Sequence, residues 1–290
     1  MRPGQCCRGA GLRPLGSCGS RQGSALRSGR REDPRLSERD DLADFALSLA
    51  DAADRISLQF FRRDLRIERK RDRTFVTDAD RAIERELRDR IAARYPQHGV
   101  LAEELDDGTS EREIRWIIDP IDATHSFMRG VPVFATLIAL ERAGVMEVGV
   151  MSAPAMRERW HATRGGGAWS GQRRLHVSKI ARLDDAQVFY ASRSAFLAVG
   201  KVRGFDAVVK ETWRDRGFGD FWGYALVAEG SGEAMIEPEL KPWDLAAPLI
   251  IIEEAGGRLT DWNGHRTYAG GNAVASNGLV HEAVLDRLNA

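Results

Sequence analysis

The sequence predicts a layered α/β fold made of two packed halves. Apolar residues at helical spacing dominate residues 36–96, and short apolar runs separated by turn signals dominate the middle of the chain. From about residue 183, strands alternate with helices. This order of patterns is typical of helices packed on sheets. With 290 residues, 43% of them hydrophobic, the chain can bury a large core as one domain or as two halves.

Two helices are predicted first. Residues 36–62 have apolar side chains at helical intervals and should form one long helix. The run from Thr77 to Asp80 has residue types that begin a helix, and Ile83 and Leu87 continue an apolar face until Pro96. We therefore expect a layer of helices before the first strands of the middle region.

Short strands and further helices should follow. The middle runs predict strands of an antiparallel or mixed sheet at 116–118, 133–140, 145–151 and 159–162, with a tight turn at 165–167. Later runs predict strands at 188–191, 233–236 and 273–275 and helices at 224–229 and 245–255. We divide the chain into a basic arm, 1–34, an N-terminal half, 35–182, and a C-terminal half, 183–290.

Charge is distributed unevenly, although the formal net charge is zero. Residues 1–31 contain seven arginines, no lysine and no acidic residue. Removing these seven from the 43 basic residues leaves 36, against 43 acidic residues in the rest of the chain. An acidic body argues against nucleic acid as the main partner and suits a protein that concentrates cations. Ordinary surface charge would give the same balance.

The arm also holds all three cysteines, Cys6, Cys7 and Cys18. The body therefore has neither disulfides nor thiolate ligands, and a reducing cytoplasm is the simplest setting. The arm has no apolar periodicity, so we expect disorder; an over-extended start site, a basic tail and an organelle-targeting peptide all fit it. The longest apolar stretch, 131–140, is about half the roughly 20 residues that a membrane-spanning helix needs, so we expect a soluble protein.

Four acidic segments follow strand or turn signals, at 76–80, 101–104, 119–124 and 243–244. Pro120 should turn the chain after a strand, which would aim Asp119, Asp122 and the carbonyl of Ile121 at one point. Such oxygen ligands suit Mg²⁺. Taken singly, each segment has a plain alternative: a solvated acidic loop, an ordinary turn, or a helix N-cap at Asp244.

Together, the four segments resemble the signature of the inositol monophosphatase superfamily, from about residue 40 to the C-terminus. The family motif Asp-Pro-x-Asp-Gly-Thr is Asp-Pro-Ile-Asp-Ala-Thr here, and Trp-Asp follows at a similar distance downstream. The resemblance implies an αβαβα sandwich of the sugar-phosphatase type. It also implies Mg²⁺-dependent hydrolysis of a small phosphate monoester by metal-activated water, in a homodimer. From charge, apolar run length and cysteine usage we expect no nucleic-acid or membrane partner and a cytoplasmic location.

The resemblance also assigns roles to positions. It implies that two or three Mg²⁺ ions are bound by Glu103, Asp119, the carbonyl of Ile121, Asp122 and Asp244. Asp80 and Thr124 would orient and deprotonate the attacking water, and Glu103 is counted with them as catalytic. The N–H groups of Ala123 and Thr124 would bind phosphate oxygens where a short helix begins. Lys70 would line the site, although Arg69 beside it competes for this role.

The chain departs from the family pattern near the site. Ala123 and Ala102 replace glycines, and Ser126 replaces an asparagine. If position 123 has a positive φ, an alanine costs about 1–2 kcal/mol; if φ is helical, the change is nearly free. Two functions of different class therefore stay open. The protein is an active phosphatase, or it is a weakened family member that binds a ligand as a regulator without turnover.

The substrate is sought in the second half. Residues 219–230 and 237–247 resemble the histidinol-phosphatase branch, in which Glu237 would contact the substrate and Asp220 would lie near the leaving group. Two carboxylates suit the ammonium and imidazole of histidinol phosphate, but they also accept hydrogen bonds from sugar and inositol hydroxyls. Histidinol phosphate is the first expectation, before inositol phosphates and then nucleoside or sugar phosphates. The plain alternative for Glu237 is a solvated loop acid.

Overall fold

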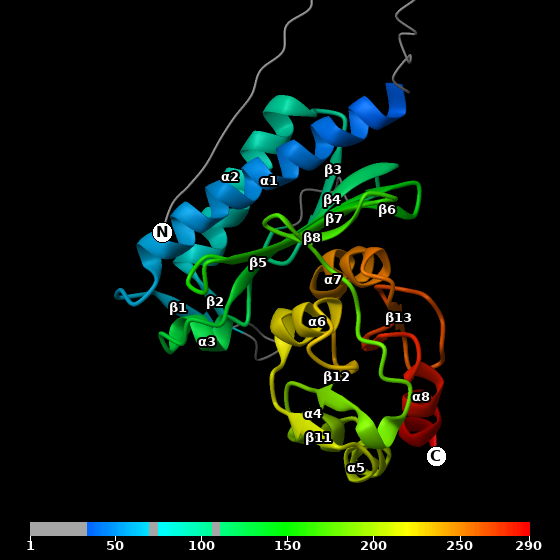
Figure 1. Cartoon of the computed structure of the whole chain (residues 1–290). Coiled ribbons are helices and arrows are strands. Elements are labelled where there is room, and N and C mark those ends of the chain that lie inside the picture. The colour runs from blue at the N-terminus through cyan, green and yellow to red at the C-terminus, as the bar shows by residue number, and fades with distance from the viewer. Residues whose placement is uncertain (1–33, 70–74, 106–110) are drawn as a thin grey trace, which may run out of the picture. The chain divides into compact units, whose positions relative to one another are not determined.

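Helices and sheets alternate as five layers in the computed structural model, which describes residues 34–69, 75–105 and 111–290 (Figure 1). Two helices cover the outer face of a seven-stranded sheet, two more lie between this sheet and a five-stranded sheet, and three cover the far face of the second sheet. The predicted αβαβα sandwich is confirmed.

The helices are α1 (Pro34–Phe60), α2 (Asp78–Arg94), α3 (Thr124–Met128), α4 (Arg193–Ala198), α5 (Val202–Glu211), α6 (Asp220–Ala228), α7 (Pro242–Glu254) and α8 (His281–Asn289). The strands are β1 (Ile67–Arg69), β2 (Phe75–Thr77), β3 (Gly99–Ala102), β4 (Ile114–Asp122), β5 (Ala135–Arg142), β6 (Val145–Ala153), β7 (Glu158–Thr163), β8 (Gly167–Ser170), β9 (Arg173–Arg174), β10 (Gln187–Phe189), β11 (Arg214–Arg216), β12 (Ala234–Pro238), β13 (Arg258–Thr260) and β14 (Asn272–Ser276).

Helices α1 and α2 form the outer layer, as the apolar spacing predicted. Their apolar faces pack against the outer face of the larger sheet through residues such as Leu49 and Ile83, which are fully buried. Helix α2 begins with a capping box. The Thr77 hydroxyl accepts the N–H groups of Ala79 and Asp80, and the Asp80 carboxylate accepts the Thr77 N–H. This box fixes the first turn of α2.

The larger sheet has the order β3-β4-β5-β6-β7-β8-β9, with β3 parallel to β4 and all other neighbours antiparallel. The expected turn at Pro120 is wrong, because β4 continues through Pro120 to Asp122. Its pairing with β5 shifts register between Asp119 and Asp122. A bulge accommodates a proline, which has no N–H to donate, and it re-aims the side chains beside it.

The side chains of β4 alternate between two cores. Trp116 and Ile118 pack against α1 and α2, and Ile117 faces the inner layer of α6 and α7. The second sheet has the order β11-β10-β12-β14-β13. Its side chains also alternate between two cores: Met235 of β12 faces the inner layer, and Ile236 faces α4, α5 and α8. Both sheets are therefore covered on both faces, which explains their apolar runs.

The inner helices start earlier than their patterns predicted. Helix α6 begins at Asp220 rather than residue 224, and α7 begins at Pro242 rather than after Asp244. Pro242 suits the first helical position because its φ is already helical and no N–H is required there. Asp244 thus lies in the first turn, not at the N-cap.

Gly149 of β6 lets α7 lie close to the larger sheet. A Cβ atom there would fall 2.4 Å from Cγ2 of Ile250 and 2.9 Å from the carbonyl oxygen of Ala247. Since α7 packs on both sheets, the two halves share one core, and the division at residue 182 stays a proposal. No helix in the described ranges is long and apolar enough to cross a membrane.

Candidate active site

Three aspartates from distant segments converge at one end of the larger sheet. Asp119 and Asp122 lie at the end of β4, where the bulge re-aims them, and Asp244 lies in the first turn of α7. One carboxylate oxygen from each lies within 4.8 Å of the others. The structure therefore brings together side chains that are 125 residues apart in the sequence, as the numbering of Asp119 and Asp244 gives.

These aspartates line a small cavity of about 140 Å³, which we call the acidic cavity. Its lining contains the predicted site residues Glu103, Asp119, Ile121, Asp122, Ala123, Thr124, Asp220 and Asp244, together with Phe75 and His125. No lysine or arginine is among the described residues that line it. The predicted Lys70 lies outside the described residues.

Burial and mutual repulsion disfavour the charged forms of these acids. Burial raises the pKa of Asp119 well above its usual range, and the charges of Glu103 and Asp122 raise it further. The pKa of Asp122 is likewise raised by burial and then by Asp220 and Asp244. Burial raises the pKa of Asp244 to about 7, although its bond from the Lys241 N–H, at 2.7 Å, lowers it.

The donor set fits a hard divalent cation. Oδ1 of Asp119 is buried and has no hydrogen-bond partner among the described residues. A buried carboxylate oxygen without a partner is costly, and a cation in the cluster would supply one. The three converging donors are all carboxylate oxygens, which Mg²⁺ prefers over nitrogen or sulfur. The residues thus fit the ion that the sequence led us to expect.

Asp80 lies beside this cluster with one oxygen fixed. Its Oδ2 accepts the N–H and the hydroxyl of Thr77 at 2.7 and 2.6 Å, and its buried Oδ1 has no partner in the described part of the chain. Burial raises the Asp80 pKa to about 6, against the lowering by Thr77, and the charge of Glu103 raises it further. The Thr124 hydroxyl donates to the carbonyl of Ile121 at 2.9 Å instead of to Asp80.

Ala123 has a left-handed backbone, with φ 64° and ψ 44°. The helical alternative for this position is therefore wrong, and the alanine carries the strain that a glycine would avoid. Asp220, at the start of α6, also has a positive φ, 56°. Two residues without glycine's freedom thus hold strained backbone at the acidic cavity, as is common at functional sites.

Glu237 is not a solvated loop acid. It lies on β12 with 5% of its surface exposed, and its carboxylate accepts the hydroxyl of Tyr224 at 3.1 Å. Burial raises its pKa well above the usual range, and the charge of Asp220 raises it further. The Asp220 pKa is also raised by burial, while the charge of His125 lowers it. The site residues predicted from the sequence include neither Tyr224 nor His125.

Helix α6 also contacts the end of β4 that carries Asp122. The N–H of Phe221 donates to Oδ2 of Asp122 at 2.6 Å. The hydrogen bond orients this carboxylate and ties the helix that carries Asp220 to the end of β4. No sequence signal could have paired residues 122 and 221, because the bond depends on how the two halves pack.

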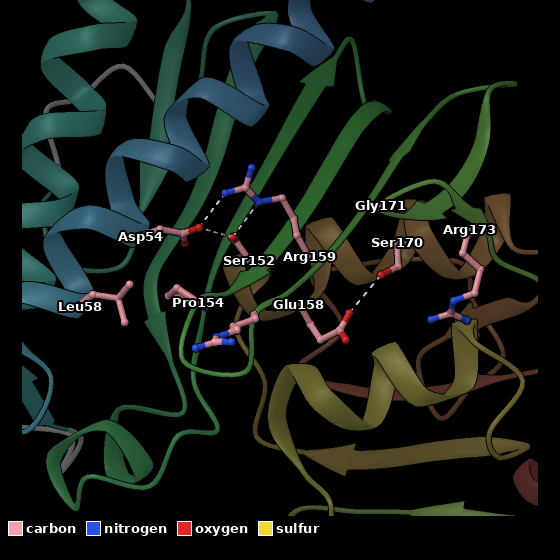
Figure 2. A pocket seen from close by; sticks show the side chains of 10 residues that line it. Asp54, Leu58, Ser152, Pro154, Glu158, Arg159, Ser170, Gly171 and Arg173 are labelled. Carbon is pink, nitrogen blue, oxygen red and sulfur yellow. Dashed lines mark hydrogen bonds and ion pairs between the residues drawn. The ribbon is translucent and has the colours of Figure 1, made fainter.

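A larger cavity of about 600 Å³ lies between α1 and the β7 and β8 strands (Figure 2). We call it the arginine cavity, because Arg157, Arg159 and Arg173 line it. Asp54 of α1 accepts a guanidinium hydrogen bond from Arg159 at 2.6 Å and a hydroxyl bond from Ser152 at 2.9 Å (Figure 2). Asp54 is thus paired with a cation of its own chain, unlike the aspartates of the acidic cavity, although burial raises its pKa and its Oδ1 has no hydrogen-bond partner among the described residues.

Comparisons with known proteins identify relatives over most of the chain. The family model described as "Inositol monophosphatase family" matches residues 38–290. The chain is 48% identical to a histidinol-phosphatase of Mycobacterium tuberculosis, over 87% of this chain and 98% of that protein. It is 45% identical to a histidinol-phosphatase of Streptomyces coelicolor, over 83% and 94% respectively.

A solved structure shows the same fold. The IMPase of Thermotoga maritima superimposes with a TM-score of 0.78 and 31% sequence identity, covering 86% of this chain and 97% of that one. The resemblance to the histidinol-phosphatase branch, inferred from the sequence, is confirmed by the two relatives above. This chain belongs to the inositol monophosphatase family.

Proposed function

We propose that this protein is a Mg²⁺-dependent phosphatase that hydrolyses histidinol phosphate. The observation that carries the proposal is the convergence of Asp119, Asp122 and Asp244 within 4.8 Å, in a cavity whose described lining contains no lysine or arginine. The names of the two most similar relatives given above support the substrate.

Two or three Mg²⁺ ions would be held by Glu103, Asp119, the Ile121 carbonyl, Asp122 and Asp244. When bound, they supply positive charge that lowers the pKa of water and offsets the charge of the phosphate. Asp80 would accept a proton from the attacking water, because its Oδ1 is buried without a partner in the described residues. Thr124 would orient that water once its hydroxyl turns from Ile121.

The phosphate would lie against the turn that joins β4 to α3. The backbone N–H groups of Ala123 and Thr124 would donate to its oxygens. The left-handed conformation of Ala123 supports this role, since it redirects the backbone directly after Asp122. Lys70 would add a cation near the phosphate.

The leaving group would face Asp220 and Glu237. Both carboxylates suit a cationic amine or imidazole through charge-assisted hydrogen bonds. Glu237 is held by Tyr224 on the inner side of β12, so it offers a fixed acceptor in a buried setting. Inositol phosphates remain the second candidate, because their hydroxyls could donate to the same carboxylates.

A phosphate-release assay tests the substrate. Purified protein is incubated with histidinol phosphate, inositol 1-phosphate, a sugar phosphate and a nucleoside monophosphate, with Mg²⁺ or with a chelator. We expect Mg²⁺-dependent release with the highest kcat/KM for histidinol phosphate. Higher efficiency with inositol 1-phosphate would replace the substrate assignment.

Glu237→Gln sharpens this assay. The substitution keeps the size of the side chain and removes its charge. We expect KM for histidinol phosphate to rise by about 10-fold, the effect of roughly 1.4 kcal/mol, and KM for inositol 1-phosphate to change less. An equal change for both substrates would contradict a charge-based contact.

A regulator without turnover is the alternative of another class, and strain at Ala123 is the observation that favours it. No phosphate release from either the native protein or Ala123→Gly, across the whole panel, would rule out the phosphatase. We further propose a cytoplasmic homodimer, as the family resemblance implies. Light scattering on the purified protein would measure its mass, and a mass of one chain would contradict the dimer.

A further inference from the structure

We infer that Glu84 is a positioning residue that fixes the metal-ligating loop after β3, and that it thereby sets the Mg²⁺ affinity of the acidic cavity. The inference rests on the proposed function in one respect, the assignment of Glu103 as a metal ligand. No sequence motif singled out Glu84, which lies one helical turn after Asp80 on α2.

The Glu84 carboxylate anchors the backbone directly after Glu103. Its Oε2 accepts the N–H of Glu104 at 2.8 Å, and its Oε1 accepts the N–H of Leu105 at 2.9 Å. The loop is thus held by both oxygens at two consecutive residues. A bidentate anchor of this kind restrains the direction of the loop as well as its distance from α2.

The anchor is buried and charge-balanced. Glu84 is fully buried, and Nε of Arg88 donates to its Oε1 at 2.8 Å. A second nitrogen of Arg88 donates to the carbonyl of Leu105. Glu84 and Arg88 of α2 therefore form hydrogen bonds with the N–H and the carbonyl of Leu105, respectively. A buried carboxylate is stable only with such partners, so the arrangement is selective for a glutamate at this position.

The same helix places two parts of the site. Asp80 and Glu84 are four residues apart, so they lie on one face of α2 and both are buried against the site. The capping box fixes Asp80, and Glu84 fixes the loop of Glu103. Helix α2 therefore sets the distance between the proposed base and a proposed metal ligand. Partners that orient a metal ligand commonly affect affinity by 10- to 100-fold.

The test compares Glu84→Gln with Glu86→Gln. Glu86 forms an ion pair with Arg90 at 2.6 Å on the same helix and at the same spacing, but both side chains are about 40% exposed. Mg²⁺ binding to the metal-free proteins is measured by titration calorimetry, thermal unfolding is measured in chelator, and kcat is measured over a range of Mg²⁺ concentrations.

We expect Glu84→Gln to weaken Mg²⁺ binding by roughly 10- to 100-fold, with kcat returning to within a few-fold of the native value at saturating Mg²⁺. Glu86→Gln should bind Mg²⁺ as the native protein does. A merely structural role predicts a lower melting temperature in chelator with unchanged Mg²⁺ affinity, and that result would overturn the inference.

Glu84→Asp is the second variant if Glu84→Gln does not fold. It keeps the charge beside Arg88 but is one methylene too short to reach both N–H groups. Weaker Mg²⁺ binding is again expected, and native affinity would refute the inference.

The binding data also separate this inference from the proposed function. If the native protein binds Mg²⁺ but releases no phosphate, the function fails while the comparison of variants still decides the role of Glu84. If the native protein binds no Mg²⁺, both fail.

Discussion

The acidic cavity and the arginine cavity differ in whether their carboxylates have a guanidinium partner. In the arginine cavity, Asp54 is paired with the guanidinium of Arg159 (Figure 2). The same guanidinium also forms an ion pair with Asp51 at 2.8 Å. In the acidic cavity, Asp119, Asp122 and Asp244 face one another with no lysine or arginine among the described lining residues. The larger cavity is therefore balanced from within, whereas the smaller one needs charge from outside the chain.

The proposed site thus lies in the smaller of these two cavities. The arginine cavity has about four times the volume of the acidic cavity, 600 against 140 Å³. An unbalanced set of buried acids costs folding free energy, and a protein retains such a cost where a ligand repays it. The comparison makes predictions that differ for the two cavities.

The largest expected effect comes from matched Asp→Asn substitutions. Asp119→Asn should lower kcat by about three orders of magnitude or more, because it removes an anionic ligand of the proposed ions. Asp54→Asn breaks the pair with Arg159 and should cost roughly 1–3 kcal/mol of unfolding free energy, with kcat within a few-fold of native. Steady-state kinetics and urea unfolding measure both effects. Near-native turnover by Asp119→Asn would remove the distinction between the cavities.

The next effect is stabilisation by Mg²⁺ and its dependence on pH. Asp80 and Asp244, with pKa values of about 6 and 7, bind protons more tightly in the folded than in the unfolded chain. The metal-free protein therefore loses stability as pH rises from about 4 to 7, and it regains none above that range. Mg²⁺ at about 100 times its Kd should restore roughly 2.7 kcal/mol.

Melting curves between pH 5 and 8, in Mg²⁺ and in chelator, check this prediction. The difference in melting temperature should grow with pH, because protons compete with the ion for the same carboxylates. Asp119→Asn should reduce the difference, and Asp54→Asn should retain it. A difference that is the same at every pH would contradict the shifted pKa values.

Gly149→Ala tests how α7 places Asp244 and should have a smaller effect. Gly149 and Ser152, which lines the arginine cavity, lie three residues apart on β6 and so face opposite sides of the sheet. The new methyl would push α7 away, at a cost of roughly 1–3 kcal/mol, and should weaken Mg²⁺ binding. Gly217→Ala is the control, since its Cβ would meet nothing closer than 3.8 Å. Calorimetric Mg²⁺ affinity unchanged in Gly149→Ala would argue against this placement.

The smallest effect is expected from Ala123→Gly. Relief of the left-handed strain of alanine, about 1–2 kcal/mol, is partly offset by the entropy of glycine, about 0.5–1 kcal/mol. The melting temperature should therefore rise by only about 1–3 °C. Turnover should equal or exceed that of the native protein. A fall in both melting temperature and turnover would mean that the methyl group has a favourable contact.

Local patterns predicted much of the fold and the candidate ligands. The helical spacing before residue 96 and the apolar runs of the first sheet identified α1, α2 and β4 to β7. Acidic residues beside strand and turn signals singled out the segments that contain Asp119, Asp122 and Asp244, and the family resemblance then assigned these residues as ligands. The role of each residue in catalysis is still a proposal.

Features that depend on tertiary contacts were not predictable. Pro120 signalled a turn, but pairing with β5 carries β4 past it as a bulge. The burial of Glu237 depends on packing between β12 and α6, and the anchor at Glu84 depends on a contact across 20 residues. The backbone of Ala123 could not be inferred from its residue type, because alanine rarely adopts a left-handed conformation.

The distance along the chain between Asp119 and Asp244 has a consequence for biosynthesis. A ribosome adds about 5–20 residues per second, so Asp119 and Asp122 leave the exit tunnel several seconds before α7 does. Until α7 docks in the inner layer, the third carboxylate is missing. On the proposed ligand set, the ion site would therefore be complete only after α7 has been synthesised and has docked.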